Sequence, residues 1–323
     1  MAIITKEISD KYALYNGDCI DVMKDIPDNK VDLGVYSPPF ADLYTFSSDI
    51  RDISNCDSYE DFIEHYRYVV KDMHRITKKG RFNCIHCCDI PSPNGAKMID
   101  LSGHIIKLHD EEGFDFVARH VIWREPLWVR NKTMLRSLTH KTIVTDASKA
   151  GVAGADYMLV FRKRGENETP IQNPTGFSHY AGLEKIPEDL KNYAGWTGDQ
   201  KVNRLSHWIW QRYASSVWDD IDMSRLMPYT ASKEEDDEKH VTPTHMDIID
   251  RVIQMRSNPN EIVFTPFLGV GTEAYCAVKL GRHAIGVELK ESYFKQAVKN
   301  MEIGSSNIVS DRAQTTMDFG LDL

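Results

Sequence analysis

The sequence predicts a doubly wound α/β fold, in which helices cover both faces of a mostly parallel seven-stranded sheet. Two observations predict it. Short apolar runs alternate along the chain with segments whose apolar residues recur at helical spacing, and several of those runs are apolar throughout. Strands covered on both faces have this second property. The 323 residues, 41% of them hydrophobic, suffice for one compact body with an insertion.

The strands are expected where a short apolar run ends in turn-forming residues. The seven runs are Ala13–Tyr15, Val31–Tyr36, Arg81–His86, Phe116–Trp123, Tyr157–Phe161, Ile262–Thr265 and Ala284–Glu288. Around the end of the third run, Cys84, His86 and Cys88 alternate, and a straight strand would not wrap them around one tetrahedral ion. We therefore predict packed strand residues there and no metal site.

Helices are expected where apolar residues gather on one face of a segment. The four segments are Tyr59–Ile76, Asp247–Met255, Glu273–Leu280 and Ser292–Met301. The first is followed by Lys78, Lys79 and Gly80, which are typical of a cationic last turn and a glycine stop.

The stretch from Gly165 to Lys239 breaks this alternation. It is rich in Asn, Pro, Gly and Asp, carries several aromatic residues, and is too long for an ordinary loop. It is either an insertion with a small core of its own or a binding region. We therefore divide the chain into residues 1–164, an insertion at 165–239, residues 240–303 and a polar, mobile tail at 304–323.

The net charge of −9 is unlike that of a protein that coats nucleic acid without selectivity. Locally the balance reverses, because Arg119 to Arg164 holds ten Lys or Arg against three Asp or Glu. Such a region either faces phosphates or is a solvated surface, and charge alone leaves both open. No run of about 20 apolar residues and no secretory signal is present, so we expect a cytoplasmic protein without membrane contact.

The first motif that carries chemistry is Ser37-Pro38-Pro39-Phe40, at the end of the strand Val31–Tyr36. Two consecutive prolines fix φ and donate no hydrogen bonds. The Ser37 hydroxyl and the Pro38 carbonyl are suited to accept from the N–H groups of an exocyclic amine, which exposes its lone pair. Phe40 would stack on a base taken out of its duplex. The simpler interpretation is a proline-terminated strand that enters a loop.

The second motif runs from Phe264 to Thr272, after a strand and before a helix. Gly269 and Gly271 let the backbone approach a ligand closely, and the helix start offers free N–H groups. Glu288 ends the next strand, where an acid commonly accepts from ribose hydroxyls. The alternative is a tight turn with a surface acid.

The third motif is Tyr15–Cys19, at the end of the first strand, where Asp18 could accept from an adenine amine. Taken by itself, Asp18 is better interpreted as a helix N-cap.

These blocks, in this order, resemble the β-class amino-methyltransferases of DNA. Ser37 to Phe40 resembles the catalytic tetrapeptide of that family, and Pro266 to Thr272 resembles its cofactor loop. Asp18 resembles the family's adenine contact and Glu288 its ribose acid. The block His240–Thr244, with Thr242, sits where the family has a cofactor-flanking segment. The resemblance covers roughly residues 12–162 and 215–300.

The resemblance implies a circularly permuted methyltransferase fold of Rossmann-like type that uses S-adenosylmethionine on a base flipped from double-stranded DNA. The cofactor would be held by Asp18, Thr242, Pro266, Phe267, Gly269, Gly271, Thr272 and Glu288. Residues 165–239 would be the target-recognition region. Because the tetrapeptide begins with serine we favour cytosine N4 as the acceptor, and adenine N6 is the alternative. The resemblance allows a cognate restriction endonuclease as a partner, and leaves monomer and homodimer open.

DNA phosphates are expected to contact basic side chains in the loop-like stretch that follows Trp123, although a solvated connector would have the same composition. These side chains are Arg124, Arg130, Lys132, Arg136 and Lys141.

The sequence departs from the family pattern at three places. Thr265 stands where an aspartate usually precedes Pro-Phe, Val270 replaces a smaller residue, and the block at His240 lacks a lysine at its end. An inactive DNA-binding module that keeps the fold is therefore an alternative.

Three other classes of enzyme fit the sequence less well. None of the 13 prolines is followed by cysteine, which disfavours methylation at cytosine carbon 5. The order of the motifs and the insertion disfavour a protein-glutamine methyltransferase. A dinucleotide oxidoreductase would leave Ser37 to Phe40 unexplained.

Overall fold

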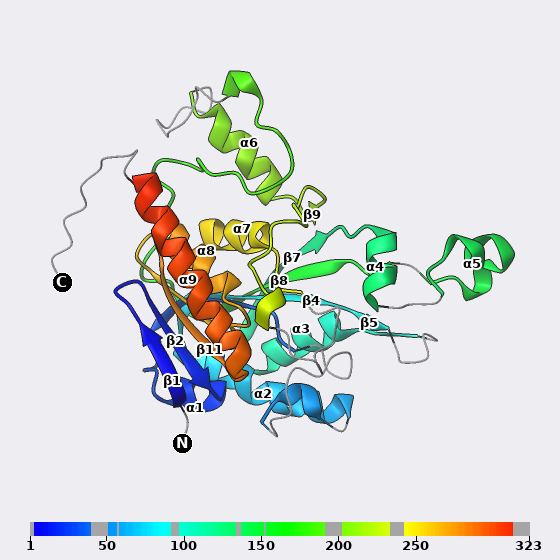
Figure 1. Ribbon diagram of the computed structural model, residues 1–323, viewed down its shortest axis with the longest axis horizontal. Coiled ribbons are helices and arrows are strands. Elements are labelled where there is room, and N and C mark those ends of the chain that lie inside the picture. The colour runs from blue at the N-terminus through cyan, green and yellow to red at the C-terminus, as the bar shows by residue number, and fades with distance from the viewer. Residues whose placement is uncertain are drawn as a thin grey trace.

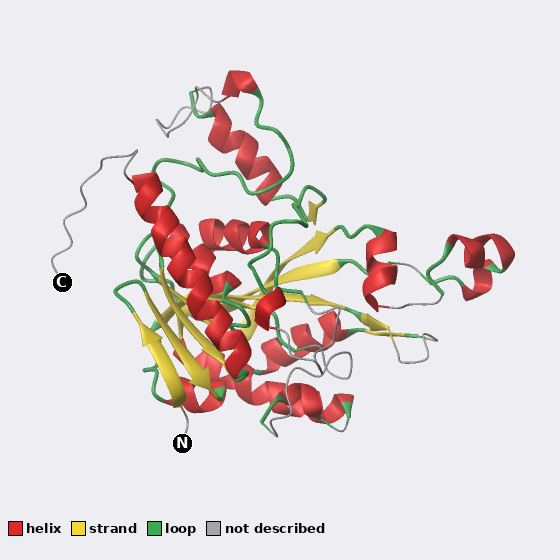
Figure 2. Cartoon of the chain, viewed as in Figure 1, coloured by secondary structure: helices red, strands yellow, loops and turns green. Residues whose placement is uncertain are grey.

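The computed structural model describes most of the chain as one large mixed sheet with helices on both faces (Figure 1, Figure 2). The described residues are 3–39, 51–56, 58–91, 97–133, 137–151, 153–190, 202–232 and 242–312. Phe40, Arg136 and the residues from 233 to Val241 lie outside them, as do residues 191–201 and 313–323. No helix among these residues is both long and apolar enough to cross a membrane.

Nine strands of the described residues form the sheet, in the order β1-β2-β11-β10-β3-β4-β8-β7-β9. Their bounds are β1 Ile3–Ile8, β2 Tyr12–Gly17, β3 Val31–Tyr36, β4 Thr77–Cys88, β7 Phe114–Ile122, β8 Asp156–Lys163, β9 Val217–Trp218, β10 Ile262–Thr265 and β11 His283–Glu288. A separate hairpin joins β5 (Ile90–Pro91) to β6 (Met98–Ile99).

The centre of the sheet is parallel from β2 through β11, β10 and β3 to β4. Strand β8 runs antiparallel between β4 and β7, β9 is parallel to β7, and β1 is antiparallel to β2. The seven predicted strands and the mostly parallel fold are confirmed. The sheet is wider by β1 and β9, which are short or exposed; Ile4 and Ile8 of β1 are more than half exposed.

The two halves of the chain meet between β3 and β10. Val263 and Phe264 pair with Leu33 and Gly34, and Ile262 N donates to Asp32 Oδ2 at 2.9 Å across 230 sequence positions. A Cβ atom at position 34 would lie 2.3 Å from Asn83 Oδ1, so any residue other than glycine would require the neighbouring side chains to shift. The late strands of the sequence are thereby placed inside the sheet, next to the early ones.

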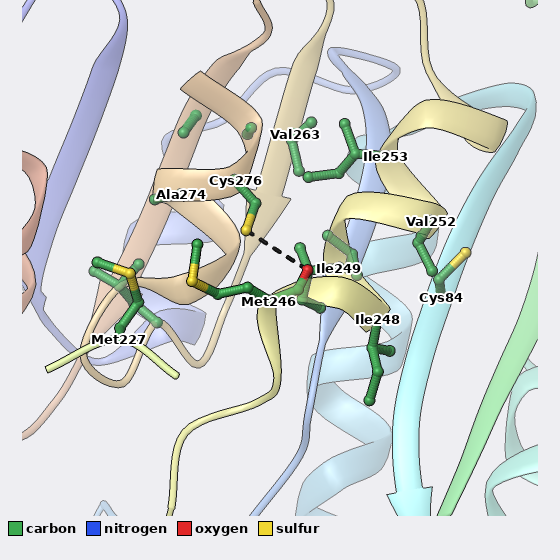
Figure 3. Close-up of a cluster of buried hydrophobic side chains, with 14 of the residues drawn as sticks. Cys84, Met227, Met246, Ile248, Ile249, Val252, Ile253, Val263, Ala274 and Cys276 are labelled. Carbon is green, nitrogen blue, oxygen red and sulfur yellow. Dashed lines mark hydrogen bonds between the residues drawn. The ribbon is translucent and has the colours of Figure 1, made fainter. Parts of the chain in front are cut away.

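Two hydrophobic cores lie on the two faces of the sheet. One face carries α1 (Cys19–Lys24), α2 (Tyr59–Ile76) and α3 (Leu101–Glu111). The other carries α7 (Met246–Arg256), α8 (Thr272–Lys279) and α9 (Glu291–Arg312), and Figure 3 shows the apolar contact between α7 and α8. Helix α9 continues past residue 303 and ends at Arg312, with the rest of the expected tail outside the described residues.

The predicted helix Tyr59–Ile76 is confirmed at both ends, and Ser58 caps it by accepting from Asp61 N. The prediction for the residues after it was wrong. Lys78 to Gly80 belong to β4, where the pairing with β3 shifts between Thr77 and Phe82. Gly80 has a φ of 71°, so its positive φ accommodates a bulge in the strand. Two lysines before a glycine are therefore compatible both with the end of a helix, as predicted, and with a bulge in a strand, as observed.

The insertion after β8 has a small core of its own, which is the first of the two predicted alternatives. Leu190, Leu205, Ile209 and Tyr213 are its buried residues, and α6 (Arg204–Tyr213) carries three of them. The insertion lies against α7, where Arg251 Nε donates to Ala181 O at 2.8 Å. Its role in target recognition, and the division of the chain into the four expected parts, stay predictions.

Candidate active site

The carboxyl ends of β2, β11, β10 and β3 lie side by side at one edge of the sheet. Asp18 follows β2, Glu288 ends β11, Pro266 follows β10 and Ser37 follows β3. Such an edge is the usual ligand site of an open α/β sheet. All three sequence motifs therefore meet at the expected place, although they come from opposite ends of the chain.

A ring contact joins the glycine loop to β3, the strand that precedes Ser37. The rings of Phe267 and Tyr36 lie edge to face, with centroids 5.7 Å apart. Tyr36 is the residue before Ser37, and its hydroxyl lies 3.2 Å from that of Tyr66 within the core. Phe267 was expected to pack against the cofactor; in the structure it is only partly buried and its described ring contact is Tyr36.

The Ser37 hydroxyl donates its hydrogen to the carbonyl oxygen of His86 at 2.9 Å. This bond leaves the oxygen lone pairs of Ser37 as acceptors. Pro38 is buried and Pro39 half-buried, and Phe40 lies outside the described residues. The Ser37 hydroxyl therefore has its hydrogen engaged and its lone pairs available to accept from an amine, as an acceptor at this position requires.

A buried ionic network lies behind this carbonyl and was not predicted. His86 Nε2 is 2.9 Å from Asp156 Oδ2, and Asp156 forms an ion pair with Arg124. Burial opposes ionisation of Asp156, but Arg124 and His86 outweigh it and hold the pKa of this carboxyl well below its ordinary value. His245, the N-cap of α7, is 3.5 Å from Arg124. The only sequence signal was that His86 lies on the strand expected beside the tetrapeptide.

The glycine loop between β10 and α8 adopts a backbone that glycine favours at two positions. Gly269 has a φ of 53° and Gly271 a φ of 95°, and Gly271 is the N-cap of α8. A Cβ atom on Gly271 would lie 3.2 Å from Ala297, whereas one on Gly269 would meet no heavy atom within 4 Å. Space is therefore open beside Gly269.

Glu288 holds this loop in place. Its carboxylate accepts from Gly269 N and from Lys290 N, both at 2.8 Å. Burial of the carboxyl raises its pKa to about 7, although these two backbone bonds act in the opposite direction. Asn16 Nδ2 donates to the Glu288 carbonyl at 2.8 Å, which joins the ends of β11 and β2. The acid predicted for a ribose thus contacts the loop predicted for the cofactor.

Asp18 caps α1. Its Oδ1 accepts from Ile20 N at 2.9 Å and from Asp21 N at 3.2 Å. The N-cap interpretation is confirmed, and contact with adenine stays a prediction.

The remaining residues predicted to bind the cofactor border the same edge. Pro266 and Thr272 are buried on either side of the glycine loop, and Thr242 is half-buried in the segment that leads to α7. Thr265, the departure from the family pattern, is buried, and its Oγ1 has no hydrogen-bond partner among the described residues. Asn16 Oδ1 is likewise buried without one in this part of the chain.

The residues predicted to contact DNA do not form a loop. Two short helices, α4 (Pro126–Thr133) and α5 (His140–Thr145), follow β7 and lie beyond its end (Figure 1). Arg130 on α4 and Lys141 on α5 are exposed, Lys132 lies within α4, and Arg136 is outside the described residues. Arg124 does not fit the prediction, because its side chain is buried against Asp156 rather than open to phosphates.

A family model described as DNA methylase, N6_N4_Mtase, matches residues 31–299, which is most of the chain and includes the tetrapeptide and the glycine loop. The chain belongs to this family.

Two relatives show how far the similarity of this DNA methylase extends. It is 25% identical over 280 residues to the type II methyltransferase M.BglII of Bacillus subtilis, across 87% of this chain and 66% of the relative. It is 24% identical over 301 residues to M1.MboII of Moraxella bovis, across 88% of this chain and 94% of the relative.

Solved structures share the fold at low sequence identity. A putative DNA modification methylase from Thermus thermophilus, TTHA0409, superposes with a TM-score of 0.60 at 21% identity, over 90% of this chain and 94% of that one. The PvuII DNA methyltransferase, described as cytosine-N4-specific, gives a TM-score of 0.62 at 14% identity, over 94% of each chain. At these identities the similarity establishes the fold, and the Rossmann-like methyltransferase architecture is confirmed.

Proposed function

We propose that this DNA methylase transfers a methyl group from S-adenosylmethionine to the exocyclic amine of a flipped base in duplex DNA, with cytosine N4 favoured. The observation that carries the proposal is the Ser37 hydroxyl, whose hydrogen is engaged by the His86 carbonyl at 2.9 Å. Ser37 follows directly on Tyr36, which touches Phe267 of the glycine loop. An acceptor for an amine and a loop for a nucleoside thus lie next to each other.

The residues at this edge fit S-adenosylmethionine. The space beside Gly269 is open, because a Cβ atom there would meet no heavy atom within 4 Å, and two buried oxygens, Asn16 Oδ1 and Thr265 Oγ1, lack partners in the described part of the chain. Glu288 would accept from ribose hydroxyls, because a carboxylate has lone pairs beyond the two that its backbone bonds use. When bound, the cofactor supplies an electrophilic methyl group on a sulfonium.

The residues of the chain then account for the acceptor side of the reaction. Ser37 Oγ and the Pro38 carbonyl accept from the two N–H bonds of the amine, which reduces delocalisation of its lone pair into the ring. Phe40 is proposed to stack on the base. The buried Asp156–His86 contact fixes the strand whose carbonyl orients Ser37. Rate enhancement would come from positioning and polarisation, with no covalent enzyme intermediate.

Duplex DNA is proposed to lie along α4 and α5 rather than over the start of the insertion. The end of β7 pairs with Asp156, as does the end of β4, so these helices leave the sheet at the edge that carries Ser37. The insertion leaves from Lys163 at the opposite edge, where Lys163 pairs with Phe114.

Charge supports the same choice. Arg130, Lys141 and Lys149 are exposed on the segment that holds α4 and α5. The exposed charges of the described insertion are mostly carboxylates: Glu166, Glu168, Glu184, Glu188, Asp189 and Asp219. A phosphate backbone favours the first surface.

Adenine N6 is the second candidate. The DNA adenine methyltransferase YhdJ of Escherichia coli strain K12 is 23% identical over 296 residues, across 90% of this chain and 83% of the relative. A tetrapeptide that begins with serine favours cytosine, and the acceptor geometry of Ser37 suits either amine.

One experiment separates these functions. Duplex DNA of mixed sequence is incubated with the protein and S-adenosylmethionine labelled on its methyl group, and the DNA is then digested to nucleosides. We expect the label in N4-methylcytosine, and a much smaller amount with Ser37→Ala. Label in N6-methyladenine would establish the second candidate. DNA binding without label in either nucleoside would establish an inactive module.

A further inference from the structure

Glu273 is a buried carboxyl group at the start of α8, two residues after Gly271. The residue is 4% exposed, and its carboxylate accepts from the Thr244 hydroxyl. Burial raises the pKa of Glu273 to about 7, and among the described residues no cation acts against that shift. A buried carboxylate without a counter-charge is unfavourable, and a cationic ligand would relieve it.

The partner of Glu273 places this carboxyl beside the site. Thr244 belongs to the half-buried segment 242–244, and the next residue, His245, lies 3.5 Å from Arg124 of the network behind Ser37. The segment therefore connects the start of α8 to the edge that carries Ser37. Three residues along α8 from Glu273, Cys276 Sγ contacts the Met246 carbonyl at 3.9 Å (Figure 3). Residues three apart share a helix face, so Glu273 faces the same segment.

We infer that Glu273 binds the α-amino group of the methionine part of S-adenosylmethionine. The inference rests on the proposed function, because it assumes that this cofactor occupies the edge beside Gly269. Glu288 would accept from the ribose on one side of the glycine loop, and Glu273 would pair with the ammonium group on the other. Thr265 at the end of β10 offers only a hydroxyl. In the glycine loop and α8, Glu273 is the buried acidic side chain that could pair with a cation.

The test compares two uncharged-sulfur ligands that share a thioadenosine part. S-adenosylhomocysteine has the amino-acid part, and methylthioadenosine lacks it. Isothermal titration gives both affinities for the wild type, Glu273→Gln, Glu288→Gln and the surface control Glu60→Gln. Glu273→Gln keeps an acceptor for Thr244 but loses the charge. We expect it to weaken S-adenosylhomocysteine about tenfold or more and to leave methylthioadenosine unchanged. Glu288→Gln should weaken both ligands, and Glu60→Gln neither.

A measurement on the wild type needs no variant to fold. The preference for S-adenosylhomocysteine over methylthioadenosine should increase as the pH rises through about 7, because the Glu273 carboxyl ionises there. A constant preference, or equal loss of both ligands in Glu273→Gln, would overturn the inference and make Glu273 a structural group. The proposed function fails separately, if both ligands bind as expected and no nucleoside is methylated.

Discussion

Among the described residues, one hydrogen bond holds the Ser37 hydroxyl, and it limits which side chains can replace it. The His86 carbonyl lies 2.9 Å from Ser37 Oγ and can only accept a hydrogen bond. A group at position 37 must therefore donate to His86 while it accepts from the substrate amine. A hydroxyl and a carboxamide can do both, whereas an ionised carboxylate can only accept.

This requirement predicts an order among substitutions at position 37. Ser37→Asn should keep more of the single-turnover methylation rate than Ser37→Asp, by about tenfold, because the aspartate would face the His86 carbonyl without a hydrogen to donate. The affinity for methylthioadenosine, which does not involve Ser37, serves as the control and should be equal in both variants. An aspartate variant as fast as the asparagine variant would show that the His86 carbonyl does not select the residue.

Glu288 predicts a pH dependence of nucleoside binding. Ribose hydroxyls donate to the ionised carboxylate, and burial raises the pKa of this group to about 7 in the free protein. The affinity for methylthioadenosine should therefore rise as the pH increases through 7 and fall below it, as titration calorimetry at a series of pH values would measure. The stability of the free protein depends on pH in the opposite direction. Because the folded state raises the pKa of Glu288 from 4.5 to about 7, the fold becomes less stable as the pH rises from about 4.5 to 7. A pH dependence that persists in Glu288→Gln would assign it to another group.

At the level of elements, the salt bridge between Arg124 and Asp156 joins the segment after β7 to the start of β8. Both residues are buried, so removal of one leaves the other charged in a poorly solvated place. Asp156→Asn should lower the free energy of unfolding by about 3–5 kcal/mol in chemical denaturation. The double variant Arg124→Met, Asp156→Leu should cost clearly less than the single change.

The pH dependence of stability gives a second measure of the same bridge. Arg124 and His86 lower the pKa of Asp156 against the effect of burial, so its stabilisation is present above the ordinary value of 3.8 and is lost as the pH falls below it. The comparison of variants decides the role of Asp156. If Asp156→Asn and the double variant Arg124→Met, Asp156→Leu are equally destabilised, Asp156 is not the counter-charge of Arg124.

Elements with a local signal were predictable, and elements that depend on distant pairing were not. Helix α2 carries its own apolar face and N-cap, and β3 is apolar at every position except Asp32, so both were predicted from the sequence. Strand β9 has two residues, which pair with the end of β7, and its Trp218 stacks on His120 with ring centroids 4.3 Å apart. The sequence of residues 217–218 does not by itself predict this contact.

The same distinction divides the candidate site. Ser37 and Gly269 were predictable because each lies in a motif whose chemistry is local, namely a proline turn after a strand and a glycine turn before a helix. Arg124 was assigned to DNA because its sequence neighbours are basic, whereas its partner Asp156 lies 32 positions later. Burial of an arginine depends on such a partner, and local charge does not reveal it.

At the scale of the whole molecule, the direction in which each connection leaves the sheet determines which surface can meet DNA. The segment that holds α4 and α5 leaves the edge that carries Ser37 and exposes Arg130 and Lys141. It also exposes Leu127, Ile143 and Val144, each more than half accessible. Basic and apolar side chains together suit a nucleic-acid backbone and its sugars. The described insertion is acidic and lies against α7.

Salt dependence of DNA binding tests this arrangement. Each phosphate contact contributes about 0.9 to the slope of log affinity against log salt concentration, so Arg130→Ala with Lys141→Ala should reduce the slope by about 2. The matched control removes two cations from the insertion, Lys185→Ala with Arg204→Ala, and should leave the slope unchanged. Because all four side chains are exposed, none of these changes should affect the fold, and thermal unfolding checks that directly. The opposite result would contradict the arrangement: if the slope falls in the Lys185→Ala, Arg204→Ala variant and stays unchanged in the Arg130→Ala, Lys141→Ala variant, DNA lies over α6. The basic surface of α4 and α5 would then not guide DNA to Ser37.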